Sequence, residues 1–382
     1  MHRLSQISGL IKQAAREAGF DLAGIAAVRD FWELNSFPAW IANGHAGEMK
    51  YMEARDEAGR LKRTTLESVA PWARSVIVCA MNYNTAQPYS THAHDPQQGW
   101  ISRYAWSRED YHDAVMKKLR VVERKLKEGL EQAGNEHVKN PHPGRKERGK
   151  DGAPSDFTTH CYVDTGPLVE RVYAKYAGVG WIGKNTCVIN QKVGSWLFLG
   201  VILTSLDIEP DLPAPDRCGT CTRCIDACPT DALIAPYQLD ANKCISYLTI
   251  EKRGTIPEEI REGMGRHVFG CDICQDVCPW NRKAPATIAP EFQSREGLVN
   301  PALEWLAEIS DEEFRKTFRG SPIRRAKRTG LRRNAVIAMG NSGDATFLPD
   351  LRKLAQDEDL IVAEHARWAK DKIESCMKKH EE

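Results

Sequence analysis

The sequence predicts an α/β domain over residues 1–205, a small cysteine-rich domain over residues 206–290 and an α-helical region over residues 291–382. The first part alternates between helix-like and strand-like hydrophobic patterns, which is typical of an α/β domain. Eight of the twelve cysteines lie between residues 218 and 278. The residues that follow are helical in pattern and locally basic. A chain of 382 residues is longer than one ordinary domain, which agrees with this division.

The first element is an amphipathic helix, because apolar residues recur at helical spacing from Leu4 to Ala14 and Gly19 can end the helix. Strands are expected at residues 22–27, 75–81, 158–163 and 196–203 and around Val188, with helices over residues 115–130 and 168–177. The amphipathic first helix is not a signal peptide, and the longest apolar run, residues 196–203, is far shorter than the ~20 residues that span a bilayer. We therefore expect a soluble, cytoplasmic protein.

The cysteines of the second region form two related runs. Residues 218–229 read C-x2-C-x2-C-x3-C-P, and residues 271–279 half-repeat this pattern. This is the pattern of bacterial two-cluster ferredoxins, in which three cysteines of each run hold one [4Fe-4S] cluster and the fourth ligates the other cluster. The rule assigns cluster one to Cys218, Cys221, Cys224 and Cys278. Cluster two takes Cys228, Cys271 and Cys274, and the isolated Cys244 is the natural fourth ligand.

Two other interpretations of these cysteines are structural zinc and disulfides. Two zinc sites would not need the tight cysteine triple or the two Cys-Pro ends, so we favour a ferredoxin-like domain with two [4Fe-4S] clusters. The remaining cysteines, Cys79, Cys161, Cys187 and Cys376, stand in apolar or helical contexts, where buried reduced thiols are expected. This cysteine usage predicts a reducing cytosol.

Basic charge is concentrated in two segments, although the whole chain is nearly neutral with 53 basic and 52 acidic residues. The segment 139–150 is rich in proline, glycine and basic residues, and it is either a solvated insertion or an RNA contact. The segment 315–333 carries nine lysines and arginines and no acidic residue. It could be a solvated face, but we expect it to contact nucleic-acid phosphates. The proposed contacts are Arg324, Arg325, Arg328, Arg332 and Arg333.

The last ninety or so residues predict helices at about 331–341, 346–354 and 360–373. A helix that ends in Gly-Asn, a short turn and a second helix is similar to a HEAT-type repeat. Only one or two such units fit in the remaining length. The region would therefore have to pack against the rest of the protein.

Asp164 follows an apolar strand and precedes a Gly-Pro turn, at the edge of a sheet where α/β enzymes bind ligands. It could instead be a helix N-cap, and the sequence does not decide between the two. The glycines at 178, 180 and 183 do not have the spacing of a dinucleotide-binding fingerprint. They would still allow a bulky ligand to approach the backbone closely.

The chain resembles the epoxyqueuosine reductase family, cobalamin-dependent iron–sulfur enzymes of tRNA modification that are related in architecture to reductive dehalogenases. The resemblance extends in order over nearly the whole chain. The matching motifs lie at residues 45–49 (HAGEM), 102–105 (SRYA), 110–112 (DYH), 163–164 (VD), 170–171 (ER), 180–184 (GWIGK), 244–251 (CISYLTIE), 270–272 (GCD) and 278–281 (CPWN).

The resemblance implies that the α/β domain is a cobalamin-binding catalytic domain and that electrons pass through both clusters to cobalamin. The substrate would be the epoxide of epoxyqueuosine at the wobble position of the tRNA anticodon, and Asp164 would be the proton donor. For that role we expect burial to raise the pKa of Asp164. The resemblance also implies a low-potential donor such as flavodoxin or ferredoxin, and a monomer. The candidate cobalamin contacts are Arg63, Tyr104, Asp164, Trp181, Lys184, Asn185, Thr186 and Ser246.

The sequence departs from family-related patterns at two places. Residues 110–115 begin like the cobalamin-ligating motif D-x-H-x-x-G but have Val115 in place of glycine, so His112 is not assigned as an axial ligand. The basic segment 139–150 is longer than the family norm. Two other functions agree less well with the sequence. A reductive dehalogenase-like enzyme has no reason to carry the basic segment 315–333, and a pure electron-transfer subunit would not need so large an α/β part.

Overall fold

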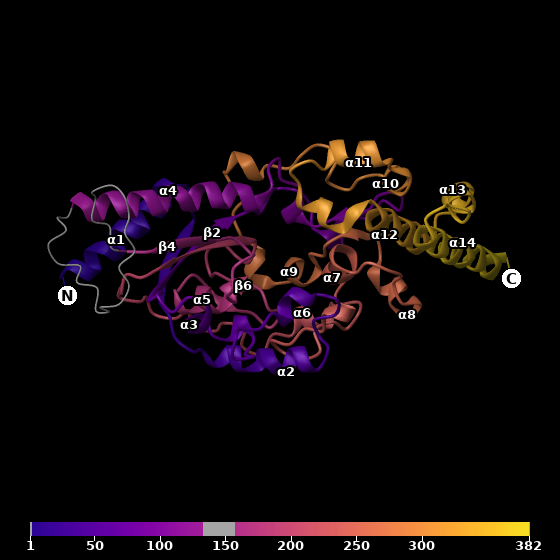
Figure 1. Ribbon diagram of the computed structural model, residues 1–382. Helices are drawn as coiled ribbons and strands as arrows, with labels where there is room; N and C mark the ends of the chain where they lie inside the picture. Colours follow the sequence, from indigo (N-terminus) through magenta and orange to yellow (C-terminus); the bar gives the residue numbers. More distant parts are fainter. Residues whose placement is uncertain (1, 133–156, 382) are drawn as a thin grey trace.

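The computed structural model describes residues 2–132 and 157–381, so the predicted basic segment 139–150 lies outside the described residues. The molecule is elongated (Figure 1). Helices α1 (His2–Glu17) and α4 (Tyr111–Gln132) lie at one end, and helix α14 (Leu360–Glu381) extends from the other. Within the described residues, no helix is both long enough and apolar enough to cross a membrane.

The main sheet has four strands in the order β1 (Leu22–Ala27), β2 (Ser75–Asn82), β7 (Leu197–Thr204) and β4 (Thr159–Tyr162). Every neighbouring pair is antiparallel, and Ile77 of β2, for example, lies opposite Ile202 of β7. All eight residues of β2 are buried, because helices cover both faces of the sheet. The predicted strands are confirmed to within about two residues.

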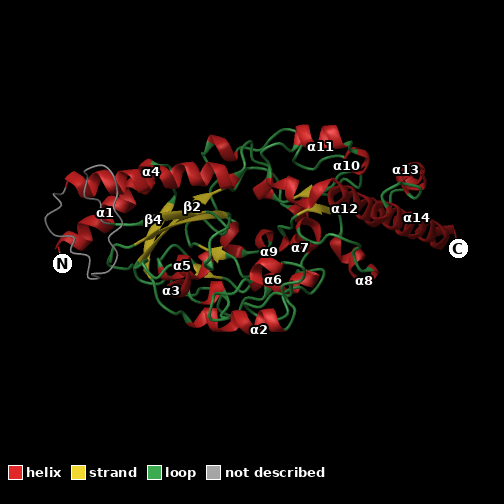
Figure 2. Cartoon of the chain, in the orientation of Figure 1, coloured by secondary structure: helices red, strands yellow, loops and turns green. Residues whose placement is uncertain are grey.

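The two faces of the sheet have separate apolar cores. Helices α1 and α4 pack on one face, where Ile11 and Leu119 meet Ile202. Helices α3 (Leu66–Val69) and α5 (Glu170–Tyr176) pack on the other, where Val172 meets Val78. The predicted combination of helices and strands is thus confirmed as a layered structure with the sheet in the middle (Figure 2). The remaining elements of this part are α2 (Phe37–Ala42), β3 (Trp100–Ile101), β5 (Trp181–Ile182) and β6 (Val188–Ile189).

The cysteine-rich region is built from short elements. They are α6 (Arg223–Asp226), α7 (Ile245–Ile250), α8 (Glu258–Arg261), β8 (His267–Phe269) and α9 (Ile273–Asp276). Strand β8 pairs in parallel with β3 of the first region. Asp272 adds a second connection, because its buried carboxylate accepts hydrogen bonds from Ser102 Oγ at 2.5 Å, the Arg103 amide at 2.7 Å and Trp100 Nε1 at 3.0 Å.

The C-terminal region is helical, as predicted. It contains α10 (Leu303–Glu308), α11 (Asp311–Thr317), α12 (Lys327–Ser342), α13 (Leu348–Leu354) and α14. Helix α12 packs against α14, and the approach is close because a Cβ on Gly340 would lie 2.8 Å from Ala369 Cα. Residues of these helices share one apolar core with Trp100 and Phe269. The C-terminal helices therefore pack directly on the other two regions.

The prediction that Arg332 and Arg333 contact nucleic acid is wrong. Helix α12 is buried from Gly330 to Gly340, and Arg332 and Arg333 are only 4% and 1% exposed. Arg332 donates to the Ala307 carbonyl and pairs with Asp357 at 2.5 Å. Arg333 donates to main-chain carbonyls of the cysteine-rich region, at Leu248, Lys252, Arg253 and Gly254. Both guanidinium groups therefore bind neighbouring segments of the protein and join α12 to them.

Candidate functional site

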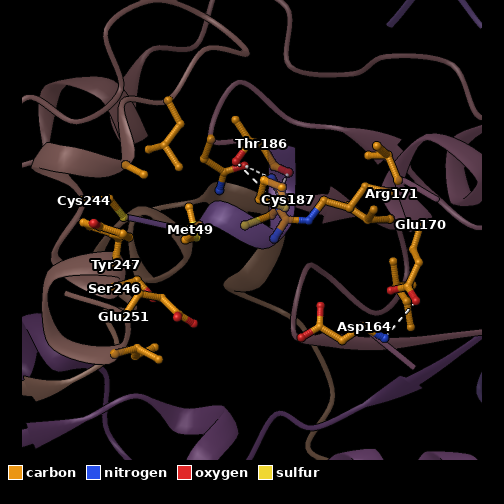
Figure 3. Close-up of a pocket in the computed structure, with 18 of the residues that line it drawn as sticks. Met49, Asp164, Glu170, Arg171, Thr186, Cys187, Cys244, Ser246, Tyr247 and Glu251 are labelled. Carbon is orange, nitrogen blue, oxygen red and sulfur yellow. Dashed lines mark hydrogen bonds between the residues drawn. The ribbon is translucent and has the colours of Figure 1, made fainter. Parts of the chain in front are cut away.

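A large cavity of about 1870 Å³ lies where the three regions meet. One wall comes from the end of the main sheet and contains Asp164 and Glu170. The opposite wall comes from the cysteine-rich region and contains Cys244, Ser246 and Tyr247 (Figure 3). Arg324, Arg325 and Lys327, from the segment just before and at the start of α12, form part of the rim. One cavity therefore contacts all three predicted regions.

Asp164 lies two residues beyond β4 in a left-handed backbone conformation, with φ of 59°. Asparagine and aspartate tolerate this conformation better than most other residues. Its carboxylate accepts a hydrogen bond from Tyr111 Oη at 3.1 Å, and its side chain is 59% exposed, facing the cavity. Helix α5 begins only at Glu170, after the N-cap position Val169. The N-cap interpretation of Asp164 is therefore wrong.

His112 lies between two carboxylates. Its Nδ1 is 2.9 Å from Asp110 Oδ1, and its Nε2 is 3.7 Å from Asp164 Oδ2. Although burial disfavours the charged imidazole, the hydrogen bonds and charges of Asp110 and Asp164 raise the pKa of His112 to about 9. Near neutral pH this imidazole is therefore protonated. The histidine of the incomplete D-x-H-x-x-G motif interacts with the predicted proton donor.

The expectation that burial raises the pKa of Asp164 is wrong. Interaction with His112 outweighs burial and, together with the Tyr111 hydroxyl, lowers the pKa of Asp164 to about 2. The proton of this pair therefore rests on the imidazole near neutral pH. The sequence did not predict this position of the proton, because His112 was not assigned as a metal ligand and no other role was expected for it.

Glu170 is a functional candidate that the sequence analysis did not single out. Its Oε1 accepts a hydrogen bond from the Asp164 amide at 2.8 Å (Figure 3). Burial and the nearby Asp164 charge raise the pKa of Glu170 to about 8. The next residue, Arg171, donates to the Thr186 carbonyl at 2.9 Å. Helix α5 thus starts with two side chains that hold two different loops of the cavity. In the sequence, the Glu-Arg pair of the matching motif was the feature that could have indicated this role.

Most of the predicted cofactor contacts line the cavity. They are Arg63, Tyr104, Trp181, Asn185, Thr186 and Ser246, together with Asp164. Lys184 is not among the lining residues. Its Nζ donates to the carbonyls of Gly219 at 2.7 Å and Cys221 at 3.0 Å. This lysine therefore supports the first cysteine run from outside the cavity.

Thiols of the same predicted group lie near Cys278 and near Cys271. Burial and the neighbouring thiols of Cys218 and Cys224 raise the pKa of Cys278 to about 11. Burial and the neighbouring Cys244 and Cys228 likewise raise the pKa of Cys271. The four cysteines that line the cavity are Cys228, Cys244, Cys271 and Cys274. The group of Cys218, Cys221, Cys224 and Cys278 lies farther from it.

Two of the other four cysteines are not the buried thiols that were expected. Cys79 and Cys161 are buried in the first region, as predicted. Cys187 lines the cavity beside Cys274, and Cys376 is exposed on α14. The contact between Cys187 and the second cysteine run depends on the packing of residues that are about ninety positions apart.

The HAGEM and CISY motifs, at residues 45–49 and 244–247, pack against each other in the cavity wall. The Glu48 amide donates to Tyr247 Oη at 2.6 Å, and Gly47 has a φ of 58°. A Cβ on Gly47 would lie 2.4 Å from Tyr247 Oη, so this position requires glycine both for its backbone conformation and for space. The contact holds the loop after α2 against the helix that begins beside Cys244.

The basic segment divides into exposed and occupied side chains. Arg315, Arg324 and Lys327 are exposed and line the cavity rim. Arg325 is also exposed at the rim, but it pairs with Glu251 and lies over the Tyr51 ring at 5.6 Å. Arg328 is half-buried and donates to the Ile309 carbonyl at 2.7 Å. The exposed part of the segment therefore faces the entrance of the cavity.

The chain is similar to known proteins. Residues 63–165 match the family model described as epoxyqueuosine reductase QueG, DUF1730, and residues 217–281 match the 4Fe-4S double cluster binding domain. The chain is 36% identical over 363 residues to the epoxyqueuosine reductase of Xanthomonas campestris, covering 94% of each chain.

Two solved structures extend the similarity to the fold. A crystal structure of epoxyqueuosine reductase with an epoxyqueuosine-modified tRNA-Tyr stem loop matches with a TM-score of 0.80 and 31% identity, over 97% of this chain and 91% of that one. The epoxyqueuosine reductase of Bacillus subtilis, with its catalytic aspartate loop swung out of the active site, matches with a TM-score of 0.80 and 30% identity over the same shares of the two chains.

The interaction between His112 and Asp164 predicts a pH-dependent stability. A raised pKa means that the imidazolium contributes fully to stability below its usual pKa of 6.5 and that this contribution is lost as the pH rises through about 9. The free energy of unfolding of the wild type should therefore exceed that of His112→Gln most below pH 6.5, and the difference should shrink by pH 9. Denaturant unfolding at a series of pH values measures it.

The lowered pKa of Asp164 does not interfere with this measurement, because its contribution is present above the usual value of 3.8 and is lost only as the pH falls towards 2. Glu170 titrates within this pH range in both proteins, so its contribution to the difference in unfolding free energy largely cancels. Asp113→Asn, an exposed change on the same helix, should leave the profile of the wild type unchanged. A difference between wild type and His112→Gln that stays constant from pH 6 to 9.5 would contradict the raised pKa.

Proposed function

Because this chain belongs to the epoxyqueuosine reductase family of oxidoreductases, we propose that it reduces the epoxide of epoxyqueuosine at the wobble position of a tRNA anticodon to queuosine. The observation that carries the proposal is the cavity itself, in which Asp164 lies across from Cys244 and which is also lined by the other three cysteines assigned to cluster two. The reaction consumes two electrons and two protons and releases the epoxide oxygen as water. The site must therefore deliver both electrons and protons.

The family model over residues 217–281 identifies this part of the chain as a domain that binds two [4Fe-4S] clusters. We assign cluster one to Cys218, Cys221, Cys224 and Cys278, and cluster two to Cys228, Cys244, Cys271 and Cys274. The neighbouring thiols around Cys278 and around Cys271 support this division. Only the second group lines the cavity, so cluster two would be the cluster next to the bound substrate.

We infer that the cavity would bind cobalamin. Its volume of about 1870 Å³ exceeds the roughly 300–1,000 Å³ of pockets for drug-sized ligands. Trp181 Nε1, which is buried in the lining, has no hydrogen-bond partner among the described residues and could bind a polar substituent of the cofactor. The residues that would hold it are Arg63, Tyr104, Trp181, Asn185, Thr186 and Ser246. When the cofactors are bound, the clusters would supply electrons one at a time. Cobalamin would supply the metal centre that reduces the epoxide.

The protein's own part in the chemistry is proton delivery. Asp164 would relay a proton to the epoxide oxygen as its bond to carbon breaks. Since the pKa of Asp164 is about 2 and that of His112 is about 9, the proton rests on His112 and would pass through Asp164 Oδ2 to the oxygen. This route needs no neutral aspartic acid in the resting enzyme. Glu170, bonded to the Asp164 amide, would keep the carboxylate in the cavity.

The tRNA would bind at the basic rim. The solved structure of a relative contains a tRNA stem loop, and the exposed Arg315, Arg324, Arg325 and Lys327 surround the entrance of the cavity here. Such contacts to phosphate position the anticodon and do not read its sequence. We assign this role to residues 291–382 as a HEAT-like region, beside a catalytic part in residues 1–205 and a ferredoxin-like part in residues 206–290. The protein would act as a monomer in the cytoplasm with a low-potential donor such as flavodoxin or ferredoxin.

The cluster assignment predicts the metal content. Protein prepared without oxygen should contain about eight iron atoms per chain, because two [4Fe-4S] clusters hold four each. Cys244→Ser should disturb cluster two and leave cluster one, which iron analysis and electron paramagnetic resonance of the reduced protein measure. The control is Cys376→Ser, an exposed cysteine on α14, which should retain all the iron. Stoichiometric zinc, or an intact second cluster in Cys244→Ser, would contradict the assignment.

The role of Asp164 predicts a loss of turnover without a loss of structure. Asp164→Asn should fold normally, because asparagine also tolerates the left-handed backbone at this position. It should keep its iron and its bound cobalamin but lose at least about a hundredfold in turnover, the usual contribution of a general acid. Nucleoside analysis of epoxyqueuosine-containing tRNA after incubation with excess reductant measures this.

For Asp164, the matched change Asp113→Asn should have full activity. Queuosine formation by Asp164→Asn at the wild-type rate would remove this residue from the mechanism. Absence of queuosine with every variant and with the wild type, despite full iron and cobalamin content, would contradict the proposed reaction itself.

The basic rim predicts salt-dependent tRNA binding. Each phosphate contact that is removed should flatten the slope of log K against log salt by roughly 0.7 to 0.9. The triple change of Arg324, Arg325 and Lys327 to alanine should therefore weaken binding severalfold or more and reduce the slope, as measured by fluorescence anisotropy. The control removes three exposed cations of α4, Lys117, Arg120 and Arg124, and should bind like the wild type. Equal slopes for both triple variants would show that the rim does not hold tRNA.

A further inference from the structure

The two cluster sites differ in their position. All four cysteines of cluster two line the cavity, and none of the cluster-one cysteines does. Cys218, Cys221 and Cys224 are instead partly exposed, between the exposed residues Gly219, Thr222 and Arg223. Given the cluster order of the proposed function, on which this inference rests, electrons would enter the protein at cluster one. The surface over these cysteines is therefore where an electron donor would have to approach.

This surface is formed by three segments that we call the cluster-one face: residues 216–226, residues 279–283 and the loop 190–195. The first two carry or follow the cysteines of cluster one, since Cys278 neighbours Cys218 and Cys224. The loop joins them because the Ser195 amide donates to Asn281 Oδ1 at 2.7 Å. A Cβ on Gly194 would lie 2.9 Å from Ala284 Cβ. The three segments are therefore neighbours in the fold.

The cluster-one face is positively charged. Its exposed basic residues are Lys192, Arg217, Arg223, Arg282 and Lys283. Its only acidic residues are Asp216 and Asp226. Asp216 accepts a hydrogen bond from Tyr237 Oη, and Asp226 accepts one from Thr222 Oγ1 at 2.8 Å. Lys184 adds an ammonium group directly behind the first cysteine run. Five exposed cations with two engaged carboxylates produce a local positive field in a chain that is nearly neutral.

An apolar residue stands beside these charges. The Leu212 side chain is 87% exposed, and Ala214, two residues later, packs like Cys218 against the apolar cluster of Trp181, Ile189 and Cys278. A charged rim with an apolar contact near a redox centre is the composition of a transient protein interface. A large hydrophobic patch, by contrast, would indicate a permanent one.

We propose that the cluster-one face is the docking site for a small acidic protein that donates one electron at a time. Charge complementarity would steer such a donor to the exposed side of cluster one, where a weak and short-lived complex is sufficient. The same charges could attract RNA, and measurement of tRNA binding to the variants described below distinguishes the two occupants.

The test follows cluster reduction in the holoenzyme by stopped-flow absorbance, with two donors. The acidic donor is flavodoxin hydroquinone, and the neutral donor is photogenerated 5-deazaflavin radical. In the wild type, reduction by flavodoxin should slow as salt is raised, because salt screens the attraction. Arg217→Glu, Arg223→Glu and Arg282→Glu together should slow reduction by flavodoxin by about tenfold or more at low salt and leave reduction by deazaflavin unchanged.

Two further variants keep the proposal falsifiable. Lys192→Glu with Lys283→Glu reverses charges farther from the cysteines, and it should slow flavodoxin in the same sense even if the first variant loses iron. Reversal of Lys117, Arg120 and Arg124 on α4 changes the total charge equally, and it should have no effect on either donor. These readings do not involve the epoxide, so a failure of the proposed reaction would not alter them.

Three outcomes would overturn the proposal. The first is flavodoxin reduction at the wild-type rate in both face variants. The second is equal slowing with deazaflavin, which would mean that the charges act on the cluster and not on docking. The third is weakened tRNA binding with unchanged flavodoxin reduction, which would identify the face as an RNA surface.

Discussion

The buried carboxylate of Asp272 is the contact on which the arrangement of the whole site depends. It lies between two cysteines of the second run and accepts hydrogen bonds from Trp100, Ser102 and the Arg103 amide. A buried carboxylate without such partners would be strongly unfavourable. The cysteine-rich region therefore has one preferred position against the segment that continues to Tyr104 and His112. This contact positions the second cysteine run relative to Tyr104 and His112.

The cavity combines charged groups that influence one another. Asp164 does not itself hold a proton at neutral pH, because the neighbouring His112 lowers its pKa to about 2. Paired with a protonated His112, it becomes part of a unit that stores a proton at neutral pH and can release it when negative charge develops nearby. The nearby Glu170, whose pKa is raised to about 8, holds the loop through the Asp164 amide.

Positive charge serves different purposes in different parts of this chain. Arg332 and Arg333 are buried and satisfy main-chain carbonyls, so they join α12 to its neighbours. Arg324 and Lys327, a few residues earlier, are exposed at the cavity rim. A third group is exposed on the cluster-one face. In the proposals made above, one exposed group would bind tRNA and the other an electron donor.

The sequence by itself determined the spacing of the cysteines, the pairing rule between the two runs and the positions of the strands and long helices. These features depend on local periodicity and on the short reach of ligands that are close in sequence. It also identified Asp164 as a residue at the end of a strand. Only the tertiary structure decided that His112 lowers the pKa of Asp164, that Lys184 supports the cluster-one run and that Arg332 and Arg333 are buried. Each of these facts depends on groups brought together from distant parts of the chain, because burial and electrostatic neighbours are properties of the packed fold and not of the local sequence.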